Sequence, residues 1–259
     1  MRRILLFLLV VTGSFLATSC LTIEERVKLN ADGSGVQTLT MDMSSMLDNP
    51  MMKMGLEQEL AKGGEMMRKD STFNIIDEMA PLNPQWSDAD RELVGRMEGR
   101  ITMDLEEGIG MVTTTFPFQN VGEMTRFSEL MKSANKAEDE ESPVAGNPFS
   151  GMNEGSIMNS IYAIKGTKLT RTTPVPDNFE NPFLSEEMEE GVMDMMMEMF
   201  GDATIVYVME FPGAVKKVKG FPGHMVDGNE LILAFDFTEM MEDPTIMAKA
   251  LSGEVKFRK

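Results

Sequence analysis

Apolar and polar residues alternate over many short stretches of this chain, a pattern typical of strands that bury one face. Two such stretches, residues 23–30 and 36–43, flank a turn that contains Asp32 and Gly33, and together they predict a hairpin. Residues 100–106 and 111–118 predict a second hairpin in the same way. Further strands are expected at residues 73–77, 156–165, 167–172, 214–219 and 254–258. Residues 225–237 are expected to contain a turn at Asp227 and Gly228 followed by an alternating strand.

Residues 203–211 differ from these strands because they are apolar on both faces. Ile205 and Tyr207 would lie on one face, and Val206 and Val208 on the other. A strand that is covered on both sides belongs in the interior of a sheet. This segment is therefore predicted to be a central strand.

Helical spacing of apolar residues predicts the helices of the fold. Ser87 is a suitable N-cap for a helix that ends near Met97, because acidic residues follow it in the first turn. Further helices are expected at residues 44–62, 120–135, 185–200 and, in part, 239–251. Hairpins combined with separate helices indicate an α+β fold, a curved antiparallel sheet with helices packed on one side.

Residues 136–155 fit neither pattern. They contain an acidic run from Glu138 to Glu141, two prolines, and several glycine, serine and asparagine residues. Because this composition buries little apolar surface, we expect a flexible, solvated loop. The alternative for the acidic run is a site for a cation or a protein partner.

The first residues have the composition of a secretory signal. Arg2 and Arg3 precede an apolar stretch from Ile4 to Val11, and small residues lead up to Cys20. The alternative is a membrane-spanning anchor, but a span needs roughly 20 apolar residues and this stretch is shorter. Residues 1–19 are therefore predicted to be a removable leader.

Residues 16–20, Leu-Ala-Thr-Ser-Cys, resemble the lipobox of bacterial lipoproteins, in its Bacteroidetes-type form because Ala17 replaces the usual leucine. The resemblance implies that Cys20 is acylated and becomes the new N-terminus. It also implies a lipidated tether at residues 20–22 and a domain at residues 23–259 in the cell envelope. Leu21 favours the outer membrane, facing the periplasm or the cell surface.

The charge balance limits the classes of partner. The chain has 24 basic and 42 acidic residues, a net charge of −18. Such a charge repels phosphate backbones and anionic headgroups, so it argues against nucleic-acid binding and against membrane attachment through a basic patch. Cys20 is the single cysteine, so no disulfide can form within one chain.

Catalytic and metal motifs are sparse. The one histidine, His224, lies in a glycine-rich turn and has no recognisable nucleophile partner. Asn30, Asp32 and Ser34 match places of an EF-hand calcium loop, but Met41 occupies the place of the bidentate glutamate, so a hairpin turn is preferred. We expect a non-enzymatic protein without a cofactor or a metal.

Methionine is unusually abundant, with 28 residues. In a helix at residues 185–200, Met193, Met196, Met197 and Phe200 would share one face. Three interpretations remain open: packing against the sheet, a pliable surface for an apolar ligand or partner, and Cu(I) binding by thioethers.

Two segments resemble the mycobacterial LppM-type lipoprotein domain: the hairpin of residues 23–43, and residues 208–215, which contain Phe-Pro-Gly before a later Asp-Gly turn. The resemblance implies an acylated lipoprotein with a curved sheet, helices and an apolar cavity. It transfers no ligand residue. The function expected is a membrane-anchored binding module for a lipid or other apolar ligand. The alternatives are an assembly lipoprotein with envelope protein partners and Cu(I) handling.

Overall fold

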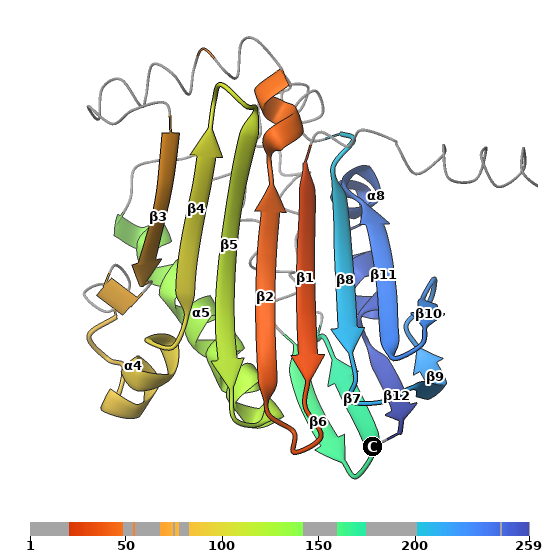
Figure 1. The fold of residues 1–259 in the computed structure, drawn as a ribbon. Helices are drawn as coiled ribbons and strands as arrows, with labels where there is room; N and C mark the ends of the chain where they lie inside the picture. Colours follow the sequence, from red (N-terminus) through yellow and green to blue (C-terminus); the bar gives the residue numbers. More distant parts are fainter. Residues whose placement is uncertain are drawn as a thin grey trace, which may run out of the picture.

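The computed structural model describes residues 21–48, 54, 68–74, 76–77, 83–141, 160–174, 201–243 and 245–258. The described strands form two sheets, and helices lie on the same side of the larger sheet as the smaller one (Figure 1). The predicted α+β class is confirmed. The predicted single sheet is wrong in one respect, because four of the strands form a separate sheet.

The larger sheet has eight strands in the order β10-β11-β8-β1-β2-β5-β4-β3. Its strands are β1 (Thr22–Leu29), β2 (Gly35–Asp42), β3 (Arg68–Asn74), β4 (Glu98–Asp104), β5 (Ile109–Phe118), β8 (Thr204–Glu210), β10 (Met225–Asp227) and β11 (Glu230–Asp236). The hairpins β1–β2 and β4–β5 are those that the alternation predicts. At the first turn Gly33 has a φ of 93°, a conformation that favours glycine.

One pairing in this sheet departs from the predicted antiparallel order. β8 pairs with β1 in parallel, from Thr22 beside Thr204 to Lys28 beside Glu210. β8 thus lies between β1 and β11, which confirms its prediction as a central strand. Hairpin signals report only neighbours in the chain, whereas this pair joins strands from opposite ends of it.

The smaller sheet has four strands in the order β6-β7-β12-β9, all antiparallel. They are β6 (Ile161–Lys165), β7 (Lys168–Thr172), β9 (Val215–Gly220) and β12 (Gly253–Phe257). The first two form the hairpin expected around Gly166. The sequence predicts β9 and β12 as strands, but nothing in their local pattern assigns them to a second sheet.

The helices are η1 (Ser44–Asp48), α4 (Asp88–Val94), α5 (Val121–Glu141), α8 (Phe237–Glu242) and α9 (Thr245–Ala250). α5 continues through Glu141, so the loop predicted from residue 136 is wrong over residues 136–141. Alanine and glutamate in that stretch have high helix propensity, which sustains the helix. The rest of that loop, residues 142–155, lies outside the described residues.

The inner face of the eight-stranded sheet carries the core. Its strands alternate between buried and half-buried positions, and one continuous apolar cluster reaches the smaller sheet and α5. Phe116 on β5 stacks on Phe127 of α5, with ring centroids 4.0 Å apart. Phe211, after β8, stacks on Phe257 of β12 at 5.0 Å. Burying each such ring contributes roughly 1.5–3 kcal/mol, so these contacts hold the layers together.

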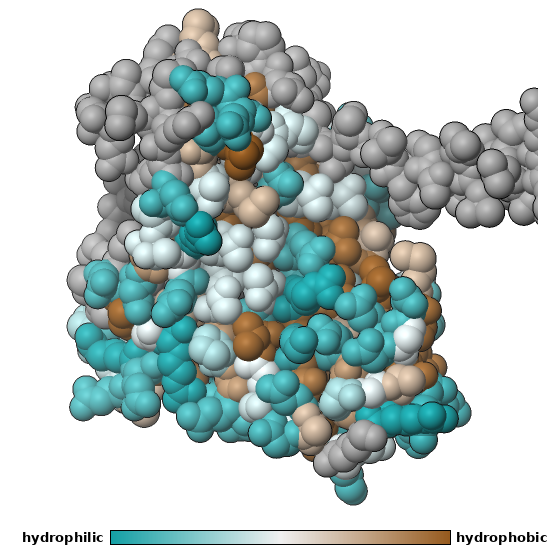
Figure 2. Space-filling view, in the orientation of Figure 1, coloured by the Kyte–Doolittle hydropathy of each residue, from teal (hydrophilic) through white to brown (hydrophobic). Residues whose placement is uncertain are grey.

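The outer face of the same sheet is more polar (Figure 2). Thr38 lies beside Thr115, and Thr40 lies beside Thr113, so threonines from β2 and β5 form a compact half-buried group. This alternation of apolar inside and polar outside is the one that predicted the hairpins.

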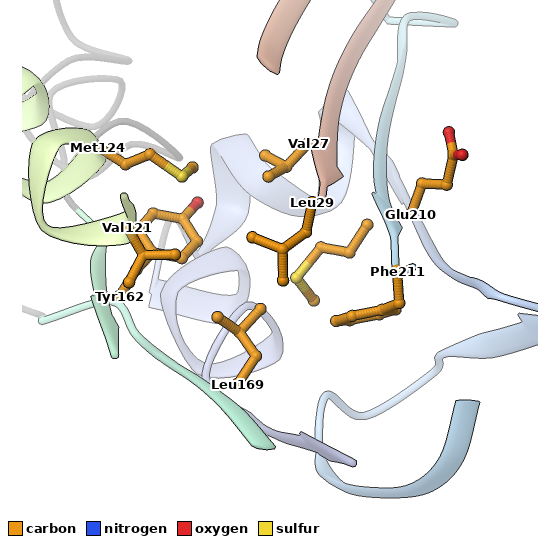
Figure 3. Close-up of a pocket in the computed structure, with 9 residues that line it drawn as sticks. Val27, Leu29, Val121, Met124, Tyr162, Leu169, Glu210 and Phe211 are labelled. Carbon is orange, nitrogen blue, oxygen red and sulfur yellow. The ribbon is translucent and has the colours of Figure 1, made fainter. Parts of the chain in front are cut away.

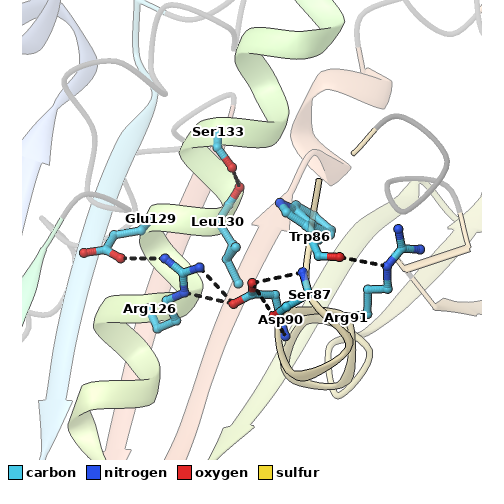
Figure 4. Close-up of polar contacts among 8 residues, drawn as sticks. All are labelled: Trp86, Ser87, Asp90, Arg91, Arg126, Glu129, Leu130 and Ser133. Atoms are coloured by element: carbon cyan, nitrogen blue, oxygen red, sulfur yellow. Dashed lines mark hydrogen bonds and ion pairs between the residues drawn. The ribbon is translucent and has the colours of Figure 1, made fainter. Parts of the chain in front are cut away.

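A polar brace joins α4 to α5 (Figure 4). The Ser87 hydroxyl accepts a hydrogen bond from the backbone N–H of Asp90, and the Asp90 carboxylate accepts from the Ser87 N–H, which forms a capping box. Arg126 of α5 donates to the Asp90 carboxylate at 2.9 Å and to Glu129 at 3.1 Å. Arg126 and Ser87 together lower the pKa of Asp90 to about 2. The predicted N-cap is confirmed.

Replacing Ser87 with alanine removes the cap and is expected to lower the free energy of unfolding by about 1 kcal/mol. Chemical denaturation of the full chain measures this change. Ser133→Ala is the matched control, because among the described residues the Ser133 hydroxyl bonds only the carbonyl of Leu130, within α5. Equal stability of the Ser87 variant and the wild type would contradict the role of the cap.

Candidate functional site

The predicted lipid attachment site lies immediately before the folded domain. Cys20 itself is outside the described residues, but Leu21 is fully buried and Thr22 begins β1. The Leu21 carbonyl accepts a hydrogen bond from the N–H of Thr204 at 2.9 Å. Of the expected tether, Leu21 is therefore held against β8 by this hydrogen bond, and Thr22 belongs to β1.

Met193, Met196, Met197 and Phe200 lie outside the described residues. Met54, within the helix expected at residues 44–62, is described and is 54% exposed. Among the described residues, no helix is long and apolar enough to cross a membrane.

A small apolar pocket lies between the two sheets and α5 (Figure 3). Its lining residues come from five elements or their ends: Val27, Leu29, Val121, Met124, Tyr162, Leu169, Met209, Glu210 and Phe211. Its cavity volume is about 10 Å³. A cavity of this size holds about one water molecule, so this pocket does not form the lipid-sized cavity that the family resemblance implies.

A buried polar cluster lies in the same interior. Its members come from both sheets and face inward: Glu25, Gln37, Ser160, Tyr162, Arg171, Thr173 and Tyr207. Gln37 on β2 donates a hydrogen bond to the Glu25 carboxylate of β1 at 2.8 Å. Arg171 on β7 donates to the Ser160 hydroxyl at 2.8 Å.

Two tyrosines surround the Arg171 guanidinium. Its central carbon lies 3.9 Å from the ring centroid of Tyr207 and 5.3 Å from that of Tyr162. The two tyrosine hydroxyls are themselves 3.2 Å apart. A buried cation attracts the faces of aromatic rings strongly, because little water competes for it. Arg171 therefore connects the smaller sheet to Tyr207 in the centre of the larger one.

Burial raises the pKa of Glu25 to about 7, although the positive charge of Arg171 and the hydrogen bond from Gln37 each act to lower it. Burial also raises the pKa of Tyr162 to about 12 and that of Tyr207 well above its usual value. Burial acts to lower the pKa of Arg171, but the two tyrosines and Glu25 outweigh it, so this pKa lies above its ordinary value. Near neutral pH, Glu25 is thus the member of the cluster that exchanges a proton.

The sequence contains a signal for this cluster. Glu25 lies between Ile23 and Val27 on the buried side of β1, and Arg171 follows Leu169 on the buried side of β7. The two-residue period places Glu25 and Arg171 on the same inner faces as these apolar residues. Burial of a charge becomes evident only when the facing layer is known.

The other sequence candidates lie on turns. In the first hairpin turn the Asp32 carboxylate accepts hydrogen bonds from the N–H and the hydroxyl of Ser34, as a turn requires. His224 has its Nδ1 2.7 Å from the Phe221 carbonyl in an exposed turn. In the described part of the chain, no three histidine, cysteine, aspartate or glutamate side chains lie close enough to hold a metal.

Glu25 makes the stability of the fold depend on pH. The pKa of its carboxyl is about 7 in the folded protein, against an ordinary value of 4.5, so the folded state retains a proton that the unfolded chain releases. The stabilisation is complete below about pH 4.5 and is lost as the pH rises through 7, with a total of roughly 3 kcal/mol. Glu25→Gln is expected to remove this dependence.

Denaturation of the full chain at pH 5 and pH 8 measures the effect. Glu24→Gln is the matched control, because Glu24 lies on the opposite, half-exposed face of the same strand. A Glu25→Gln protein that loses as much stability between the two pH values as the wild type would contradict this role of Glu25.

Comparisons with known proteins give one structural likeness. The sequence matches no protein-family profile. No curated protein matches it either. Among solved structures, the chain is similar to the folded domain of the Mycobacterium tuberculosis LppM protein, determined by NMR, with 9% sequence identity and a TM-score of 0.36. The match covers 93% of this chain and 92% of that one.

Proposed function

We propose that this protein is a lipoprotein held to a membrane by acylated Cys20, and that its domain is a non-enzymatic binding module for a lipid or other apolar ligand. The observation that carries the proposal is the junction between the signal sequence and the fold. A basic start, an apolar stretch and small residues lead to the single cysteine, and the buried Leu21 follows directly. The membrane in question is the outer membrane, with the domain facing the periplasm or the surface.

The junction limits how far the domain can lie from the bilayer. Leu21 is fixed in the sheet by its hydrogen bond to Thr204, so no flexible linker separates an acyl group on Cys20 from β1. Two or more acyl chains give stable anchoring, because each buried CH₂ contributes about 0.8 kcal/mol. Such an anchor holds the start of β1 at the membrane surface.

The proposal assigns the apolar ligand to the methionine face of residues 193–200. The pocket between the sheets is too small for a lipid, with a volume of about 10 Å³. Phe200 precedes Thr204 by four residues, a span of at most about 14 Å. In the sequence this face comes shortly before β8, the strand that pairs with β1 directly after Cys20. Flexible thioether side chains suit an adaptable apolar surface.

Replacing Cys20 with serine is expected to abolish acylation and to release the protein from the membrane fraction. The full chain is expressed in a bacterial host, the membranes are separated, and the intact mass shows whether acyl groups are present. Ser19→Ala, which keeps a small residue before the cysteine, is the matched control. A Cys20→Ser protein that stays with the membrane and keeps its mass would contradict the anchor.

Native mass spectrometry tests ligand binding by the full chain purified in mild detergent. A non-covalent mass of lipid size, lost on denaturation, is expected. Met193→Gln with Met197→Gln should weaken its retention by about tenfold, because an amide in an apolar contact costs more than 1.4 kcal/mol. Met111→Gln with Met225→Gln, on the outer face of the sheet, is the matched control.

The two outcomes lead to different conclusions. If lipid retention falls in the Met193→Gln, Met197→Gln variant but not in the control, the result supports the methionine face as the ligand surface. A protein that carries no extra mass, before and after incubation with membrane lipid extract, would overturn the binding module and leave the anchor proposal intact.

A further inference from the structure

The outer face of the smaller sheet is basic, although the whole chain has a net charge of −18. Lys165 on β6 lies directly opposite Lys168 on β7, Lys168 lies opposite Lys256 on β12, and Lys256 lies opposite Lys217 on β9. Residues opposite each other on neighbouring strands share a face. These four residues, the lysine row, therefore cross all four strands of the sheet.

The lysine row is unfavourable for folding, because like charges directly opposite each other destabilise a sheet. Lysine on an edge strand has a structural use, since it prevents pairing with another chain. That use accounts for Lys165 and Lys217, which lie on the edge strands β6 and β9. It does not account for Lys168 and Lys256, because β7 and β12 are inner strands.

Among the described residues, few negative charges compensate the positive charge of the lysine row. Lys168 donates to the Glu254 carboxylate at 2.6 Å, and this contact lowers the pKa of Glu254, with further contributions from Lys219 and Lys256. Among the described residues, Lys165, Lys217 and Lys256 form no ion pair, and all three are exposed. Among the described residues of these strands, the carboxylate of Glu254 therefore shares the face with five lysines, the lysine row and Lys219. The face can attract an additional anion.

We propose that the lysine row is the docking surface for an acidic helix of a protein partner. Neighbouring strands lie about 4.8 Å apart, so the row presents a cation at about that interval. Carboxylates three or four residues apart on a helix are about 5–6 Å apart, so a helix laid across the strands places one near each lysine. An extended acidic strand spaces its side chains on one face by about 6.7 Å and fits the interval less well.

The position of the row also favours a protein partner over the anchoring bilayer. The row lies near the Gly166 turn between β6 and β7, at the opposite end of the molecule from the start of β1 (Figure 1). If Cys20 holds the start of β1 at a membrane, the row lies at the end of the domain farther from that membrane. This step rests on the proposed anchor, whereas the lysine row itself does not.

The test measures binding of a fluorescent synthetic helix with glutamate at every fourth position to the full chain in neutral detergent. The triple variant Lys165→Gln, Lys217→Gln, Lys256→Gln is expected to bind the helix roughly tenfold more weakly. Each exposed ion pair that is lost lowers the affinity by up to severalfold. Lys28→Gln, Lys249→Gln, Arg100→Gln removes the same charge elsewhere and should bind as the wild type does. High salt should abolish the difference.

Thermal unfolding provides a second measurement. The lysine-row variant should be at least as stable as the wild type, because it removes like charges that oppose each other. A loss of stability in this variant would indicate a structural role and would overturn the proposal. The proposal would also be overturned if a peptide with glutamine in place of glutamate bound as tightly as the acidic peptide.

Vesicles distinguish a lipid surface from a protein partner. Row-dependent binding to phosphatidylglycerol vesicles that exceeds binding to the peptide would overturn the proposal in favour of an anionic membrane. Peptide binding that persists in a Cys20→Ser protein would support the docking surface even if the anchor proposal failed.

Discussion

The parallel pairing of β1 with β8 is the constraint on which the rest of the structure depends. It joins the N-terminal hairpin to the C-terminal strands and makes one continuous sheet of eight strands. The hydrogen bond from the Thr204 N–H to the Leu21 carbonyl lies at the start of this pairing, where Thr22 is beside Thr204. A contact between such distant segments must overcome a large loop-closure entropy, so burial of both strands has to stabilise it.

The same pairing creates the interior in which the polar cluster lies. Glu25 and Tyr207 are register partners on β1 and β8, and Arg171 reaches Tyr207 from the facing sheet. A buried charge is tolerated only where hydrogen bonds, rings and opposite charge replace water. Arg171 meets that condition through Ser160 and the two tyrosines, and it fixes the smaller sheet against the larger one at a defined position.

The fold also separates two chemically different ends. The first strand of the sheet begins two residues after the cysteine of the predicted signal, and the lysine row lies at the far end of the molecule. A lipid anchor and a protein-binding face at opposite ends would let the domain connect a membrane to an acidic partner. The net negative charge of the chain would oppose adsorption of the rest of its surface to anionic headgroups and so favour that orientation.

Local features of this fold could be predicted from the sequence, and so could its candidate anchor. The Asp32–Gly33 hairpin, the Ser87 cap and the central strand near Tyr207 each follow from residues close together in the chain. Their signals are turn chemistry, capping and period-two alternation, and each acts within about ten residues. Cys20 and the methionine face are predictions of the same local kind, and they lie outside the described residues.

Beyond the hairpins, tertiary structure alone decided which strands are neighbours. Local alternation places Glu25 and Arg171 on inner faces, but their approach depends on how two sheets pack. The lysine row likewise combines residues from four strands that are spread over the second half of the chain. Net charge is a sum over all residues and cannot reveal how the fold gathers cations on one face. Composition and the two-residue alternation of apolar and polar positions determine each strand. Strand order and register determine which charges lie side by side, and both depend on contacts between distant segments.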